Sequence, residues 1–119
     1  MTTKNILIID DCDACRELLE LELTDWGFRP ITVKNAYQAF STLETMHIDL
    51  IVLDVEMKPL SGVEAFKVLS RDFPTIPVVV FTAYGTAKLN EFNPHPTAFL
   101  MKKADLSELK MTIQTLTTS

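Results

Sequence analysis

Five short runs of apolar residues recur along the chain and are separated by segments long enough to form helices. The runs cover residues 6–9, 30–33, 50–53, 78–81 and 98–101. Apolar runs without polar alternation are typical of strands that are buried on both faces, as in a parallel sheet. Parallel strands need crossover connections, and these are almost always right-handed. The pattern therefore predicts an α/β fold, with five strand–helix units wound into a parallel sheet that has helices on both faces.

The segments between the runs carry the signals of helix ends. A first helix is expected from Ala14 to about Trp26, with Gly27 close to its end and its N-cap at Asp11 or Asp13. Later helices are expected to begin at polar capping residues, namely Asn35, Ser61 with Glu64, and Asp105 with Glu108. The stretch between Tyr84 and Thr97 has few apolar residues and contains Asn93-Pro94-His95-Pro96, so the fourth helix is expected to be short or irregular.

Size and charge narrow the range of functions. A chain of 119 residues with 47% hydrophobic side chains is expected to form one domain over residues 1–119. Its net charge is −5 and its eleven basic residues are scattered, which argues against direct binding to nucleic acid. No apolar run is long enough to span a membrane, and the N-terminus lacks the pattern of a signal peptide. A cytoplasmic protein without membrane contact is expected.

Acidic residues stand directly after two of the predicted strands. Asp10 and Asp11 follow the first run, and Asp54 follows the third. Side chains at the carboxyl ends of neighbouring strands meet at one edge of an open α/β sheet. Three carboxylates in one small volume repel one another unless a cation lies between them. Oxygen ligands without nearby His or Cys ligands favour Mg²⁺ or Mn²⁺.

A hydroxyl and an ammonium group are expected at the same edge. Thr82 comes at the end of the fourth strand and Lys102 at the end of the fifth. A carboxylate nucleophile, a divalent cation, a lysine and a threonine together suit the transfer of a phosphoryl group. Asp54 alone is more often a residue that caps a turn, but the combination of these strand ends favours chemistry.

At this point the sequence resembles a response-regulator receiver domain of two-component signalling, over essentially the whole chain. The residues that carry the resemblance are the pair Asp10-Asp11, Asp54 with Met57 and Gly62 after it, Thr82 with Ala83, and Phe99 with Lys102. The resemblance implies a flavodoxin-like sheet with the strand order 2-1-3-4-5. It also implies Mg²⁺ (or Mn²⁺) as the cofactor.

The resemblance further implies a role for each matching residue. Asp54 is the phosphoacceptor and Asp11 a direct metal ligand, Asp10 acts on the metal through water, and the backbone carbonyl of Glu56 completes the protein ligands. Thr82 hydrogen-bonds the phosphoryl group and Lys102 pairs with it. Phe99 is the switch aromatic that turns inward when Thr82 moves.

The partners implied are a sensor histidine kinase or phosphotransfer protein, which donates the phosphoryl group, and a downstream protein. A receiver catalyses only its own phosphorylation and dephosphorylation and is otherwise a switch. The chain ends shortly after the last predicted helix, so action through protein partners is expected unless it is a piece of a longer protein. The alternative is a receiver-like interaction module that is not phosphorylated.

The sequence departs from the family pattern at several positions. Lys58 and Lys103 stand where the family usually has proline, so the often cis bond after Lys102 is expected to be trans, because cis before a non-proline residue costs about 2.5–4 kcal/mol. The segment from Thr82 to Phe99 is about two residues shorter than usual. Glu56 and Tyr84 occupy positions that tune the lifetime of the phosphoryl group in this family.

The cysteines, the histidines and two further motifs do not point to another function. Cys12 and Cys15 form a C-x-x-C at a helix start, but the adjacent acids argue against an oxidoreductase, and the cysteines are interpreted as small packing residues. His47 and His95 lack the spacing of metal ligands. A haloacid-dehalogenase-like phosphatase fits poorly, because residue 56 is Glu, the motif is mid-chain and 119 residues leave no room for a cap domain. An FMN-binding flavodoxin fits poorly because an acidic turn follows Ile9.

Overall fold

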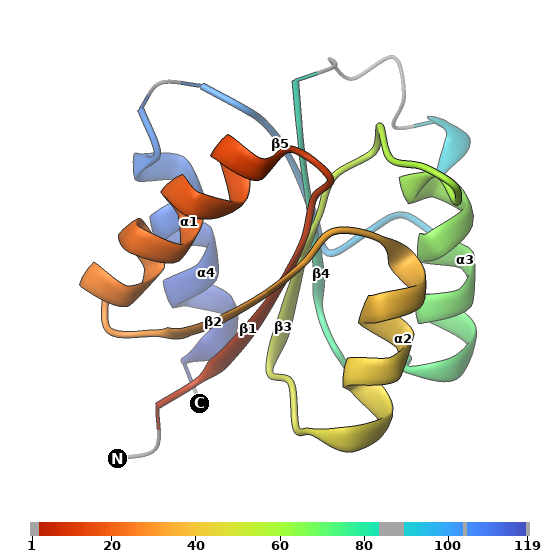
Figure 1. Cartoon of the computed structure of the whole chain (residues 1–119), viewed down its shortest axis with the longest axis horizontal. Helices are drawn as coiled ribbons and strands as arrows, with labels where there is room; N and C mark the ends of the chain where they lie inside the picture. Colours follow the sequence, from red (N-terminus) through yellow and green to blue (C-terminus); the bar gives the residue numbers. More distant parts are fainter. Residues whose placement is uncertain (1–2, 84–89, 104, 119) are drawn as a thin grey trace.

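The computed structural model of the chain describes residues 3–83, 90–103 and 105–118. Its described strands are all parallel and pair in the order β2-β1-β3-β4-β5, which confirms the order 2-1-3-4-5 (Figure 1). The strands are β1 (Asn5–Ile9), β2 (Arg29–Val33), β3 (Leu50–Leu53), β4 (Val78–Thr82) and β5 (Ala98–Met101). Each predicted run is thus a strand, with the first, second and fourth one residue longer than predicted.

Four α-helices among the described residues cover the two faces of the sheet. They are α1 (Asp13–Asp25), α2 (Ala36–Thr45), α3 (Gly62–Asp72) and α4 (Ser107–Thr117). Helices α1 and α4 lie on one face, and α2 and α3 lie on the other (Figure 1). The sheet is therefore doubly wound, as the alternation of apolar runs with helical segments predicted.

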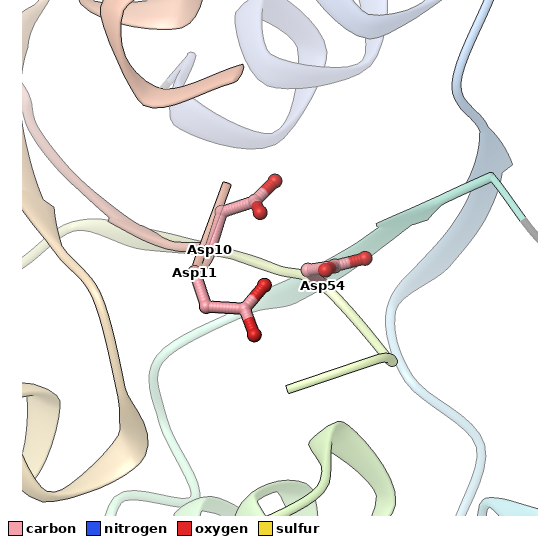
Figure 2. Close-up of side chains that lie close together, drawn as sticks. All are labelled: Asp10, Asp11 and Asp54. Atoms are coloured by element: carbon pink, nitrogen blue, oxygen red, sulfur yellow. The ribbon is translucent and has the colours of Figure 1, made fainter. Parts of the chain in front are cut away.

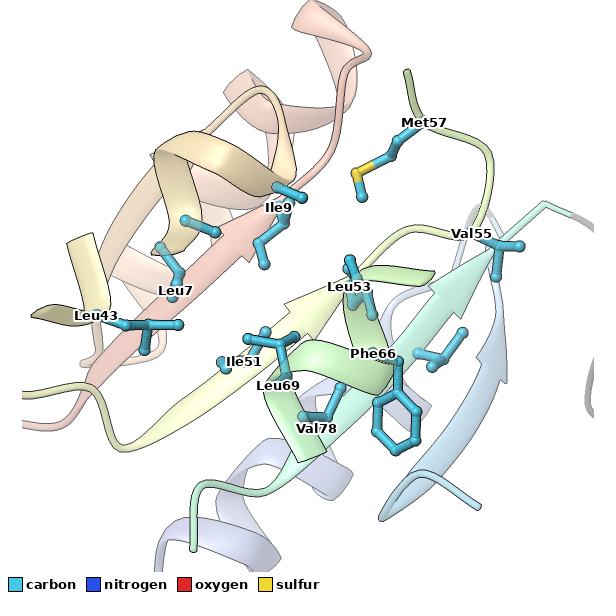
Figure 3. Packing of buried hydrophobic residues seen from close by; sticks show 14 of the residues in the cluster. Leu7, Ile9, Leu43, Ile51, Leu53, Val55, Met57, Phe66, Leu69 and Val78 are labelled. Atoms are coloured by element: carbon cyan, nitrogen blue, oxygen red, sulfur yellow. The ribbon is translucent and has the colours of Figure 1, made fainter. Parts of the chain in front are cut away.

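The core consists of two apolar layers, one on each side of the sheet. Leu7 and Ile9 of β1 pack toward α2 and α3, whereas Ile6 and Ile8 pack toward α1 and α4. Figure 3 shows the first layer, in which the side chains of the central strands meet those of α2 and α3. Each buried Leu or Ile contributes roughly 1.5–3 kcal/mol. The expectation of burial on both faces is correct for β1, β3 and β4 but wrong for β2 and β5, because each has a neighbouring strand on one side only.

Two of the predicted helix caps are confirmed. The Asn35 side chain accepts a hydrogen bond from the backbone N–H of Gln38 at 2.9 Å and caps α2. The Ser61 hydroxyl accepts one from the N–H of Glu64 at 3.2 Å and caps α3. Both bonds satisfy N–H groups that the first turn of a helix leaves without a backbone partner.

The other two predicted caps are wrong. The N-cap of α1 is Cys12, whose sulfur accepts a hydrogen bond from the N–H of Cys15, and the helix covers Asp13–Asp25 instead of residues 14–26. Helix α4 begins at Ser107 after Leu106, one residue later than a cap at Asp105 requires. Asp105 instead accepts hydrogen bonds from the backbone N–H and the hydroxyl of Ser107, a local turn that competes with helical geometry.

The segment between β4 and β5 is described only in part. Residues 84–89 lie outside the described residues. The prediction of a short or irregular helix between β4 and β5, the fourth helix expected from the sequence, is therefore tested only over residues 90–97. There Asn90 and Glu91 form a short 3₁₀ turn, and the segment that contains Pro94 and Pro96 is irregular. Cis peptide bonds precede Pro59 and Pro94, and the Lys102–Lys103 bond is trans. No helix in the described part of the chain is long and apolar enough to cross a membrane.

Candidate functional site

Three carboxylates meet at the carboxyl ends of β1 and β3. Asp10 directly follows β1 and Asp54 directly follows β3, and the paired register of Ile9 with Leu53 puts the two aspartates side by side. Each of Asp10, Asp11 and Asp54 has a carboxylate oxygen within 4.8 Å of those of the others (Figure 2). Asp10 and Asp54 are buried, while Asp11 is exposed. The predicted convergence of acids at this edge is thus present.

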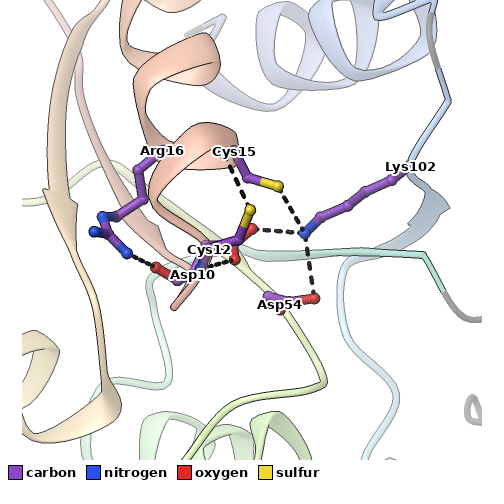
Figure 4. A network of polar contacts seen from close by, with 6 residues as sticks. All are labelled: Asp10, Cys12, Cys15, Arg16, Asp54 and Lys102. Atoms are coloured by element: carbon purple, nitrogen blue, oxygen red, sulfur yellow. Dashed lines mark hydrogen bonds and ion pairs between the residues drawn. The ribbon is translucent and has the colours of Figure 1, made fainter.

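Lys102 brings a positive charge to the same edge. Its backbone N–H donates to the Thr82 carbonyl at 2.6 Å, which ties the end of β5 to the end of β4. Its ammonium donates to Asp10 Oδ2 at 2.6 Å and forms a longer ion pair with Asp54 Oδ1 at 3.5 Å (Figure 4). The described structure therefore brings Asp10, Asp54 and Lys102 into one charged cluster, with the tighter contact to Asp10.

The start of α1 fixes the position of Asp10. The backbone N–H of Cys12 donates to Asp10 Oδ1 at 3.0 Å, and the guanidinium of Arg16 donates to the Asp10 carbonyl oxygen at 2.6 Å (Figure 4). Arg16 also pairs with Asp13. Because Lys102 holds the other carboxylate oxygen, Asp10 has a partner on both Oδ atoms. Arg16 was not predicted as a site residue, because its place in the first turn of a predicted helix is that of an ordinary exposed residue.

The charges at this edge do not balance. Burial, together with the negative charge of Asp10 and to a lesser extent of Asp11, raises the pKa of Asp54 to about 6, although Lys102 and the Val55 N–H act in the opposite direction. Burial alone would lower the pKa of Lys102, but the hydrogen bond that its ammonium donates to Asp10 and the charges of Asp54 and Asp10 raise it above its usual range. An added cation near Asp54 would stabilise its ionised carboxylate.

The turn after Asp54 depends on Gly62, the first residue of α3. The Gly62 N–H donates to the Val55 carbonyl at 2.8 Å. A Cβ at Gly62 would lie 2.3 Å from the Asp54 carbonyl oxygen and 2.6 Å from Val55 Cα, closer than real atoms approach. Glycine is therefore required by close backbone contact, and it lets the start of α3 pack directly on the chain that carries Asp54.

The acidic cluster fits a hard divalent cation. Carboxylate oxygens are the ligands that Mg²⁺ and Mn²⁺ prefer, and the three aspartates are close enough to share one ion. Glu56, whose carbonyl is the further predicted ligand, lies two residues beyond Asp54 with an exposed side chain. Asp10, Asp11 and Asp54 would hold the ion, which would neutralise negative charge at this edge.

Thr82 and Phe99 lie on adjacent strands, at different depths. Thr82 is fully buried at the end of β4, whereas Phe99 is half-buried in β5 and pairs in register with Val80. The Phe99 ring packs edge-to-face on Phe92, at 5.9 Å between ring centroids, and Phe92 packs on Phe66 of α3 at 5.4 Å. The predicted switch aromatic is thus the outer member of an aromatic stack.

Phe92 was missed as a core residue. It is only 2% exposed, although it belongs to a segment that was expected to be irregular. It is one of few apolar residues in that segment, which was a usable signal. A segment without regular structure still has to cover the sheet edge, and one large side chain can do so.

The cysteines border the acidic cluster through the Cys12 backbone N–H and the Cys15 sulfur, but neither sulfur belongs to the group of potential metal ligands. Burial, a hydrogen bond with the Cys12 side chain and the nearby negative charge of Asp10 raise the pKa of the Cys15 thiol to about 11, although Lys102 opposes this. His47 pairs with Asp49 at the opposite edge of the sheet, at 2.8 Å. Within the described ranges, the one group of three or more potential metal ligands is that of Asp10, Asp11 and Asp54.

Known proteins match both the sequence and the fold. The transcriptional regulatory protein ZraR of Klebsiella oxytoca is 28% identical over 111 residues, which are 92% of this chain and 25% of that protein. The chain spans about a quarter or less of the length of the curated relatives it matches. Their remaining length has no counterpart in this sequence.

Solved structures of response regulators have the same fold as this chain. The response regulator protein TrrA of Thermotoga maritima, in complex with Mg²⁺-BeF, matches with a TM-score of 0.90 and 28% identity, over 96% of this chain and 99% of that one. The complex of histidine kinase ThkA with TrrA matches with a TM-score of 0.84 and 26% identity, over 98% of this chain and 100% of the matched chain.

The family model of the response regulator receiver domain matches residues 6–114, nearly the whole chain. This match agrees with the strand order β2-β1-β3-β4-β5 and with the acids at the carboxyl ends of β1 and β3. The chain therefore belongs to the response regulator receiver family of two-component signal transduction.

Proposed function

We propose that Asp54 accepts a phosphoryl group in the presence of Mg²⁺ (or Mn²⁺) and that this modification changes which proteins the chain binds. The observation that carries the proposal is the position of Asp54, beside two further carboxylates and 3.5 Å from the Lys102 ammonium. Burial and the negative charge of Asp10 destabilise the ionised Asp54 carboxylate, and an added cation would offset this negative charge. The Lys102 ammonium is close enough to pair with a phosphoryl group on Asp54.

In the proposed reaction an Asp54 carboxylate oxygen attacks phosphorus, and the bond from phosphorus to the donor nitrogen breaks. Mg²⁺, when held by Asp11, Asp54 and the Glu56 carbonyl, with Asp10 acting through water, supplies positive charge that neutralises the phosphoryl oxygens. Lys102 moves from Asp10 toward the new phosphoryl oxygens, a short displacement because its ammonium already contacts both aspartates. The buried Thr82 hydroxyl donates to another phosphoryl oxygen, and Phe99 follows the movement of Thr82.

The partners in this proposal are a sensor histidine kinase or phosphotransfer protein and a downstream protein. The matched complex of a histidine kinase with TrrA supports the first of these. The proposal treats residues 1–119 as one receiver domain in the cytoplasm, and the chain catalyses only its own phosphorylation and dephosphorylation. It assigns no direct contact with nucleic acid, in line with the net charge of −5.

The test is intact mass spectrometry after incubation with Mg²⁺ and acetyl phosphate, a small phosphodonor. The wild type is expected to gain one hydroxylamine-labile phosphoryl group, and Asp54→Asn is expected to gain none. Asp49→Asn is the matched control, because Asp49 precedes the same strand that Asp54 follows, and it should be modified like the wild type. A wild type that binds Mg²⁺ but stays unmodified would favour the interaction module without phosphorylation.

A further inference from the structure

The proposed phosphoryl transfer leaves two adjacent thiols without a role. Cys12 caps α1, and its sulfur accepts a hydrogen bond from the Cys15 N–H at 3.3 Å. The Cys12 sulfur therefore contacts the backbone of the residue that carries the second thiol (Figure 4). Both cysteines are free and half-buried. A C-x-x-C pair at the start of a helix has the spacing of dithiols that form an intrachain disulfide.

These thiols contact the acidic edge from two sides. The backbone N–H of Cys12 holds Asp10 Oδ1 at 3.0 Å. The Cys15 sulfur lies 3.8 Å from the Lys102 ammonium, which holds Asp10 Oδ2 at 2.6 Å (Figure 4). Both oxygens of Asp10 are therefore positioned by groups that belong to the cysteine pair or touch it. A bond between the two sulfurs would compete with the present contacts of both, the Cys12 sulfur with the Cys15 N–H and the Cys15 sulfur with the Lys102 ammonium.

We propose that Cys12 and Cys15 form a reversible dithiol–disulfide site for low-molecular-weight disulfides, and that its oxidation weakens Mg²⁺ binding at the edge formed by Asp10, Asp11 and Asp54. The reason is that the residues around a metal ligand orient it, and disturbing such partners typically lowers metal affinity by 10–100-fold. The metal half of this inference rests on the proposed Mg²⁺ site. The disulfide half does not.

The oxidation is a pair of thiol–disulfide exchanges. The Cys12 thiolate attacks one sulfur of the small disulfide, that S–S bond breaks, and one small thiolate leaves. The Cys15 thiolate then attacks the Cys12 sulfur of the mixed disulfide, and the second small thiolate leaves. The two protons lost by the cysteines pass through solvent to the two departing thiolates. In total the protein loses two electrons and two protons, and the small disulfide becomes two thiols.

The experiment uses oxidised glutathione as the probe oxidant on the folded chain. Intact mass without reduction should show the loss of two hydrogens and resistance to alkylation, reversed by dithiothreitol. Isothermal titration with Mg²⁺ alone should then give a dissociation constant about tenfold higher for the oxidised than for the reduced protein. Circular dichroism spectra of the two forms should coincide, which excludes unfolding as the cause.

The double variant Cys12→Ser/Cys15→Ser is the matched control, since serine at position 12 can still cap α1. Its Mg²⁺ affinity should be the same with and without oxidant. A stable glutathione adduct, or no loss of hydrogens under excess oxidant, overturns the disulfide. An oxidised protein that binds Mg²⁺ as tightly as the reduced one overturns the coupling. Absence of Mg²⁺ binding by the reduced protein instead counts against the proposed metal site, and the mass data still decide the disulfide.

Discussion

Asp49 and Asp54 stand at the two ends of the same four-residue strand, and their surroundings are opposite. Asp49 precedes β3 and accepts hydrogen bonds from the Asn5 N–H at 2.8 Å and from the His47 ring at 2.8 Å. Burial alone would raise its pKa, but these hydrogen bonds and the His47 charge lower it below the usual value. Asp54 follows β3 among other carboxylates, and its pKa is raised to about 6.

The comparison separates a structural aspartate from one placed for chemistry. At the amino ends of the strands, the Asp49 carboxylate clasps the start of β1 to the start of β3. At the carboxyl ends, the Asp54 charge is poorly compensated without an added cation. Folding alone does not explain a buried carboxylate near a like charge, and such groups concentrate at functional sites.

The largest effect is expected from Lys102→Met, which removes the positive charge beside Asp54 at the carboxyl end of β3. It leaves the buried Asp10 and Asp54 carboxylates without their ammonium partner, and removal of one member of a buried ion pair costs about 3 kcal/mol. Urea unfolding in EDTA at pH 7 measures the loss. Lys103→Met is the matched control, because Lys103 is exposed and its loss should change stability by less than about 0.5 kcal/mol. Equal effects of the two variants would contradict the assigned charge cluster.

A smaller effect of opposite sign is expected from Asp54→Asn, which removes the difference between the two ends of β3. The pKa of Asp54 is about 6 in the folded protein and near 3.8 in the unfolded chain, so the folded state binds more protons between these values. Ionised Asp54 thus costs stability that grows from about pH 4 to pH 6 and is constant above. Without metal, the variant should be more stable than the wild type by about 2 kcal/mol at pH 7.

Urea unfolding across pH 4–7 checks this window. The advantage of Asp54→Asn should become small near pH 4, where the folded wild-type carboxyl is protonated and the unfolded one is about half protonated. Saturating Mg²⁺ should also reduce it, because ligand binding stabilises the folded wild type. A constant advantage at every pH would show that the charge of Asp54 is not its cause.

The smallest effect is expected from Asp49→Asn, which removes the negative charge at the amino end of β3 and tests whether Asp49 has a structural role. The lowered pKa of Asp49 means that its ionised form stabilises the fold above the unfolded pKa, and that this contribution is lost as the pH falls through the folded pKa. The variant should lose about 1 kcal/mol at pH 7, and less below about pH 4. Thermal unfolding at both pH values measures it, and a gain in stability at pH 7 would contradict the role as a clasp.

Much of the site could be predicted because it is local to strand ends. An aspartate that directly follows an apolar run, such as Asp10 or Asp54, lies at the carboxyl end of a strand, and this position does not depend on how the rest of the chain folds. The cap of α1 was not predictable in the same way, since Asp11 and Asp13 are better N-cap residues than Cys12 by their side chains. The Asp10 carboxylate accepts the Cys12 N–H, and the chain then enters the helix at Cys12.

The sequence by itself determined the five strands, the double-sided packing of the sheet and the residues at its carboxyl edge, because these follow from the spacing of apolar runs. Only the tertiary structure decided how the charges pair. Lys102 is 92 positions from Asp10 along the chain, and its closer contact with Asp10 than with Asp54 depends on how β5 is tied to β4. The same holds for Phe92, whose burial between Phe66 and Phe99 depends on the path of an irregular segment. Periodicity reports which face of an element is buried, whereas distances between remote side chains arise only when the elements pack.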